Sequence, residues 1–123
     1  MLREKGDTLN LYCCHLPHGY EERVGIVDAI LEDISATGGE AVVGGDMNSL
    51  AVSAPVTMLS RGGLKDTWLE KGCGSGGTFY GFGFGIRIDY IFHSAGLEAL
   101  RMRRIPASAI SDHDALWAEY ERK

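Results

Sequence analysis

The chain has 123 residues, of which 45% are hydrophobic, and its formal net charge at pH 7 is −5. This length and apolar content suit one globular domain, residues 1–123, and argue against a disordered chain. The acidic balance argues against a protein that grips long nucleic acid mainly by neutralising its phosphates. No run approaches the roughly 20 apolar residues of a membrane-spanning helix, and the charged first residues are unlike a signal peptide. We therefore expect a cytoplasmic protein without a membrane span.

The cysteines, Cys13, Cys14 and Cys73, are odd in number, and two of them are adjacent. This spacing suits neither a disulfide framework nor a zinc site, so reduced thiols are expected. Cys14 precedes His15, and neighbouring side chains of a regular strand point to opposite faces. That geometry argues against a cysteine–histidine nucleophile pair.

The first half of the chain alternates between strand and helix patterns. An apolar, β-prone run over residues 8–15 predicts a strand, and apolar residues at helical spacing predict a helix over 19–35. A second strand is predicted over 40–44 and a short helix over 51–60.

The second half is dominated by strands. The glycine-rich stretch 72–85 predicts a loop, and residues 86–92 give the clearest strand of the sequence. Two further strands are predicted over 97–103 and 115–120. The alternation of strands and helices predicts an α/β fold.

Polar residues that can do chemistry lie at or near four of the predicted strands. His15 ends the first strand, Asp46 and Asn48 follow the second, Asp89 lies in the third, and the sequence Ser-Asp-His at 111–113 precedes the last. Carboxylates can hold a hard cation or activate water, while imidazole and amide groups can stabilise charge on phosphate oxygens. The set therefore suits metal-assisted phosphoryl transfer.

Each of these residues also has a purely structural interpretation. An Asp-x-Asn sequence after a strand is usually a turn that caps the next helix, with Asn48 or Ser49 as the cap. A single histidine such as His15 is more often structural, and Ser-Asp-His could be a polar turn. Asp89 is harder to explain in this way, because a carboxylate on an apolar strand is costly to bury without a partner such as His113.

Four motifs, in this order and at these separations, resemble the C-terminal half of the endonuclease/exonuclease/phosphatase superfamily. They are CHLP at 14–17, GGDMNS at 44–49, RIDYIF at 87–92 and SDH at 111–113. The stretch TFYGF at 78–82 further resembles small bacterial members. The resemblance extends from about residue 9 to residue 120. It implies one part of a four-layer α/β sandwich, the C-terminal half, with a mainly antiparallel or mixed sheet.

The resemblance implies a metal-dependent phosphoesterase in which water attacks the phosphorus atom. Asp46 would activate or orient the water and contribute to metal binding, and Asn48 would hold the water or a phosphate oxygen. Asp112 would bind the metal, which the oxygen ligands suggest is Mg²⁺, or Mn²⁺ in its place. The substrate would be nucleic acid, a nucleotide, an inositol phosphate or a lipid head group.

The same resemblance gives the histidines their roles. His15 would donate a hydrogen bond to the phosphate. His113 would stabilise the transition state, held in tautomer and orientation by Asp89.

One part of the family pattern is missing from the sequence. The family has an early strand that ends in asparagine and a Leu-Gln-Glu-like segment whose glutamate is a principal magnesium ligand. We therefore expect a domain that is truncated at its N-terminus relative to the family. Two hypotheses stay open: a phosphoesterase, or an inactive remnant or interaction module that lacks the metal-binding glutamate.

Half of a sandwich would leave one sheet face uncovered. We expect Val42, Ile88 or Tyr90 to be exposed there and to favour self-association.

Overall fold

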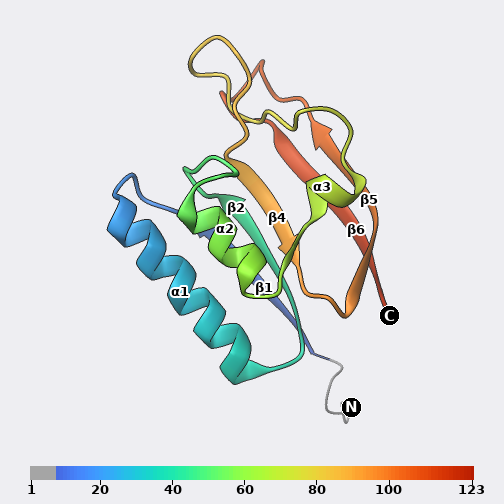
Figure 1. Ribbon diagram of the computed structural model, residues 1–123. Helices are drawn as coiled ribbons and strands as arrows, with labels where there is room; N and C mark the ends of the chain where they lie inside the picture. Colours follow the sequence, from blue (N-terminus) through green and yellow to red (C-terminus); the bar gives the residue numbers. More distant parts are fainter. Residues whose placement is uncertain (1–7) are drawn as a thin grey trace.

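The computed structural model describes residues 8–123 and has the α/β fold that the sequence predicts (Figure 1). Within these residues, no helix combines the length and the apolar sequence needed to cross a bilayer. In chain order the elements are β1 (Leu9–His15), α1 (Tyr20–Thr37), β2 (Glu40–Asp46), α2 (Ala54–Arg61), β3 (Lys65–Asp66), α3 (Thr67–Lys71), β4 (Asp89–His93), β5 (Leu97–Ile105) and β6 (Ala115–Arg122).

The strands form a mixed four-stranded sheet and a separate two-stranded ribbon (Figure 1). The sheet has the order β1-β2-β4-β3, in which β1 and β2 are parallel and the other pairs are antiparallel. The ribbon pairs β5 with β6 in antiparallel fashion. The expected combination of mixed and antiparallel pairing is confirmed.

The hydrophobic core lies between one face of the four-stranded sheet and the helices α1 and α2. Val43 of β2 and Phe92 of β4 are fully buried there, against Val27 of α1 and Leu59 of α2. Residues that alternate along a strand point to the same face, so the period of two places these side chains toward the helices. Burial of such side chains is the dominant stabilising contribution to the packing of the sheet against α1 and α2.

The opposite face of the sheet is covered at β4 and open at β1. At β4 it is covered by the ribbon and α3: His93 is 1% exposed, its ring lies 5.1 Å from that of Tyr120, and Nε2 contacts Glu70. At β1 it is open, and Leu11 is 69% exposed. Leu9, Leu11 and Cys13 share this open side, which we call the β1 outer face.

The expected exposure of Tyr90 is wrong. Tyr90 is fully buried, because it points toward the helices, and its hydroxyl oxygen lies within hydrogen-bond distance of the carbonyl oxygens of Ser49 and Arg87, 2.8 and 2.9 Å away. Val42 and Ile88 are half-buried.

Two stretches differ from the predicted elements. The strand expected over 86–92 begins only at Asp89, because Ile86 instead forms an isolated bridge with Phe79 in the preceding loop. The short elements β3 and α3 have no predicted counterpart. Asp66 ends β3 and caps α3, since its side chain accepts the amide hydrogen of Trp68.

Candidate active site

Three polar side chains lie in one row across the ends of neighbouring strands. His15 of β1 pairs with Asp46 of β2, and Asp46 pairs with Asp89 of β4. Residues paired across strands share a face of the sheet, so all three side chains lie on the face opposite the helices. The register of three strands therefore assembles this part of the site.

The approach of β1 to β2 beside this row requires glycine. Gly45 has a φ of +140°, a backbone conformation that L side chains rarely adopt, and a Cβ atom there would lie 1.8 Å from the carbonyl oxygen of Cys14. The second glycine of the GGDMNS motif is thus explained by backbone packing.

The turn after β2 fixes the carboxylate of Asp46. The backbone N–H of Asn48 donates to Asp46 Oδ1 over 2.8 Å, and the Asn48 side-chain amide donates to the carbonyl oxygen of Leu16. Asn48 itself has a positive φ of 44°, and its carbonyl oxygen accepts a hydrogen bond from Arg23 of α1. Non-glycine residues held in this conformation concentrate at functional sites.

The helix-capping interpretation of this turn does not apply. The N-cap of α2 is Ser53, and Ser49 instead donates to the carbonyl oxygen of Met47.

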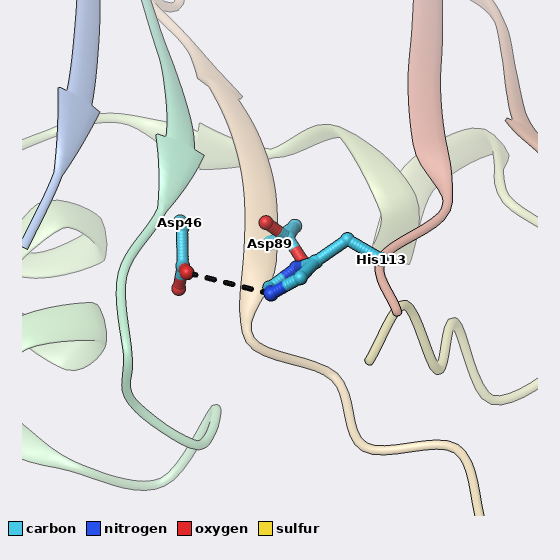
Figure 2. Close-up of side chains that lie close together, drawn as sticks. All are labelled: Asp46, Asp89 and His113. Carbon is cyan, nitrogen blue, oxygen red and sulfur yellow. Dashed lines mark hydrogen bonds and ion pairs between the residues drawn. The ribbon is translucent and has the colours of Figure 1, made fainter. Parts of the chain in front are cut away.

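His113 enters the site from the segment before β6 and contacts both carboxylates (Figure 2). Its Nδ1 donates to Asp89 Oδ2 over 2.8 Å, while its Nε2 lies 3.8 Å from Asp46 Oδ2. Because a carboxylate accepts hydrogen bonds, the contact with Asp89 places a hydrogen on Nδ1 and directs Nε2 toward Asp46. Ligand atoms of these three residues lie within 4.8 Å of one another.

The glycine-rich loop supplies two further residues that sequence reasoning did not assign to the site. Thr78 is fully buried, and its hydroxyl donates to Asp89 Oδ2 over 2.6 Å. The ring of Phe79 lies 4.9 Å from the imidazole of His113. The backbone N–H of Asp114 donates to the carbonyl oxygen of Thr78, which ties the loop to the segment that carries His113. In the sequence, the feature that could have indicated both residues was the TFYGF stretch at 78–82, which contains them.

The remaining predicted residues lie at the margin of this group. His15 Nε2 lies 3.4 Å from Asp46 Oδ2, but its side chain is 78% exposed. Asp112 is also exposed, and its carboxylate does not belong to the group formed by Asp46, Asp89 and His113 within the described residues. Its assignment as a metal ligand stays a prediction.

The neighbouring thiol is not an activated nucleophile. Burial raises the pKa of Cys14 to about 11, with smaller contributions from Cys13 and Asp46. Since the thiolate is the reactive form, Cys14 is protonated and inert at neutral pH.

A cavity of about 530 Å³ opens in front of His15, Asp46 and His113. It is lined by His15, His18, Asp46, Asn48, Ser49, Leu50, Phe79, Phe82, Ile86, Ile88 and His113.

Residues 4–113 match the sequence model of the Endonuclease/Exonuclease/phosphatase family. The chain belongs to this family. Its members hydrolyse phosphoester bonds, and the family is generally dependent on divalent metals. No curated protein matches the sequence.

Solved structures of family members share the fold. An endonuclease/exonuclease/phosphatase from Bacteroides vulgatus is 25% identical, with a TM-score of 0.78 over 89% of this chain and 48% of its own. A mannosyl-6-phosphatase from Bacteroides thetaiotaomicron is 24% identical, with a TM-score of 0.76 over 90% of this chain and 50% of its own. A humanized D. rerio TDP2 is 21% identical, with a TM-score of 0.72 over 92% and 55%. The chain spans about half the length of these structures.

The imidazole of this family member has a raised pKa. Burial lowers the pKa of His113, but the hydrogen bond and charge of Asp89, together with the charges of Asp46 and Asp112, raise it above its ordinary value of 6.5. Because the folded-state pKa exceeds the unfolded one, protonated His113 stabilises the fold at low pH. This contribution is lost as the pH rises through the folded-state pKa.

The Asp89→Asn substitution is expected to lower the pKa of His113, because it removes the neighbouring negative charge while leaving a side chain of the same shape. A pH titration of the His113 ring signals by NMR measures this shift directly. An unchanged pKa would contradict the assignment of Asp89 as the main partner.

Thr78→Val is expected to lower the rate of the phosphoester hydrolysis that is proposed below by about 10- to 100-fold, the usual effect of losing a group that orients a site residue. The substitution keeps the shape of the side chain but removes the hydroxyl that holds Asp89. Thr78→Ser, which retains the hydroxyl, is the matched control, and kcat of the two variants is compared. Equal losses in both variants would assign Thr78 a packing role only.

Proposed function

We propose that this chain is a metal-dependent phosphoesterase, or the part of one that carries these site residues, and that it uses water as the nucleophile. The observation that carries the proposal is the contact chain Asp46–His113–Asp89, of which Asp46 and His113 line the cavity. A carboxylate faces an imidazole whose other nitrogen is held by a second carboxylate, and this arrangement combines a base with an oriented donor.

In the proposed reaction, Asp46 orients the attacking water and accepts its proton. The water oxygen forms a bond to phosphorus as the ester P–O bond breaks, and the leaving oxygen departs with the alcohol part of the ester and takes a proton from solvent water. His113 donates from Nε2 to a phosphate oxygen whose negative charge grows, and Asp89 keeps the imidazole oriented and favours its protonated form. His15 and Asn48 are proposed to contribute further hydrogen bonds to the phosphate or the water.

The donor set fits a hard divalent cation. The carboxylate of Asp46 has Oδ2 directed toward the cavity histidines, and oxygen ligands favour Mg²⁺ or Mn²⁺. Asp46 would hold the cation, with Asp112 as the second proposed ligand. When bound, the cation would neutralise charge on the phosphate oxygens.

The proposal is tested by assaying an aryl phosphodiester and an aryl phosphomonoester in Mg²⁺, in Mn²⁺ and in chelator. Hydrolysis of either ester that stops in chelator supports the proposal, and the preferred ester defines the activity. No hydrolysis by a sample that still unfolds cooperatively would favour the second hypothesis, an inactive remnant or interaction module.

We also propose that the chain self-associates through the β1 outer face, with a second copy of itself as the partner. Leu9 and Leu11 are 47% and 69% exposed there, and the face is continuous with the row that includes His15. Light scattering at micromolar concentration is expected to show a dimer, and Leu11→Glu is expected to give a monomer. Leu69→Glu, at a leucine of α3 that is 77% exposed, is the matched control and should leave the dimer intact. A wild-type monomer would contradict the proposal.

A further inference from the structure

The side of the cavity next to His113 is built from phenylalanine rings in mutual contact. The ring of Phe79, which packs on His113, meets the ring of Phe82 edge-on with 5.7 Å between centroids. Phe84 continues the series, with its ring centroid 6.5 Å from that of Phe82. The rings thus extend outward from the proposed phosphate site, and we call them the phenylalanine row.

Packing within the described residues does not account for the outer part of this row. Phe82 is 70% exposed and Phe84 is 64% exposed, although both belong to a short loop that could have placed polar residues there. Scattered exposed apolar residues are normal, but adjoining exposed rings at the wall of a cavity indicate a binding surface. Phe82 lines the same cavity as Asp46 and His113.

The cavity therefore combines two kinds of lining. Histidine and asparagine side chains can donate hydrogen bonds to a phosphate, whereas Phe79, Phe82, Leu50, Ile86 and Ile88 offer only apolar contact. A ligand that contacts both kinds of lining has a phosphate and, a short distance from it, a planar group with apolar faces. Aromatic rings bind such groups by offset or edge-to-face stacking.

We propose that the phenylalanine row binds a planar heteroaromatic ring of the substrate, so that the chain selects phosphoesters that carry a nucleobase-like group over phosphoesters of a bare sugar. The inference rests on the proposed phosphoester site, because it places the phosphate at His113. Phe82 is the specificity-determining residue in this arrangement. Stacking on such a ring tolerates any base, because every base has a π-face.

The test compares adenosine 5′-monophosphate with ribose 5-phosphate. Both carry the same phosphate on the same sugar, and only the first carries a ring. Affinities are measured by NMR titration in Mg²⁺, and phosphorus spectra of the same samples follow any hydrolysis. The nucleotide is expected to bind about tenfold more tightly than the sugar phosphate, the effect of one stacked base.

Phe82→Ala is expected to reduce the affinity for the nucleotide to that for ribose 5-phosphate, without changing the latter. Phe82→Leu keeps an apolar side chain but no ring, so it separates stacking from simple apolar contact and should also lose most of the preference. Leu69→Ala, at an exposed leucine outside the cavity, serves as the control and should retain the preference.

Equal affinities for the two compounds, or a preference that survives Phe82→Ala, would overturn the inference, whether or not either compound is hydrolysed. A preference that depends on Phe82 without any hydrolysis would support the ring site, and the proposed activity would then be decided by the aryl ester assay. The two proposals can therefore fail separately.

Discussion

Replacing His113 with alanine is expected to lower kcat for the preferred aryl phosphoester in Mg²⁺ by about 10²- to 10³-fold, the usual effect of removing one donor to an oxygen that gains negative charge. The substitution removes the only side chain that joins Asp46 and Asp89 by direct contact among the described residues. It also leaves the carboxylates of Asp46 and Asp89 without the imidazole that lies between them. We therefore expect binding of anionic esters to weaken together with turnover.

The melting temperature of the His113→Ala variant serves as the control for folding. His113 is partly exposed, so its removal leaves no large cavity in the core. Full activity in a well-folded variant would exclude His113 from the reaction.

The largest effect on stability is expected from Asp66→Ala, which should lower the free energy of unfolding by about 3–5 kcal/mol, the usual cost of leaving one member of a buried ion pair alone. The side chains of Asp66 and Arg87 are 6% and 11% exposed and form a two-point contact, with Arg87 Nη1 2.8 Å from Asp66 Oδ2. Asp66 also caps α3, and the Arg87 guanidinium lies 4.6 Å from the ring centroid of Tyr90. The substitution therefore uncouples β3, α3 and the segment before β4.

Urea unfolding measures this effect, and the chain contains its own control. Arg101 and Glu119 also form a two-point contact, but on the exposed surface of the ribbon. Glu119→Ala is expected to change stability little, because water screens exposed ion pairs. A double variant, Asp66→Leu with Arg87→Leu, should be less destabilised than Asp66→Ala, since no unpaired charge stays buried. Similar losses in Asp66→Ala and Glu119→Ala would show that burial of the first pair does not matter.

Most of the sheet and the first helix could be predicted from the sequence, because each has a local hydrophobic period. The period of two in β1 and β2 and the helical spacing in α1 are properties of short segments. The position of Tyr90 was also within reach: a strand that turns Asp89 toward a site must turn Tyr90 the other way. The expected exposure of Tyr90 ignored that a strand has two faces, of which one packs against the helices.

The rest of the architecture depends on contacts between distant segments. The two-residue strand β3 exists only because it pairs with β4, and no local pattern marks it. Thr78 and Phe79 reach the site because the loop pairs with the segment that carries Asp112 and His113, some 30 residues later in the chain. Of the predicted site residues, Asp46, Asp89 and His113 lie together, and their chemical roles stay predictions.

The pairing of three strand ends in one row has a consequence for how this chain tolerates insertions and deletions. Along β2, Val43 faces the core and Asp46 faces the cavity because the two residues lie an odd number of positions apart. Deleting one residue between them would leave Asp46 pointing into the apolar interior, or else would turn Val43 outward. Length changes in this strand would therefore cost folding and chemistry together, whereas the same change in the exposed loop around Phe82 would leave the register of the sheet unchanged.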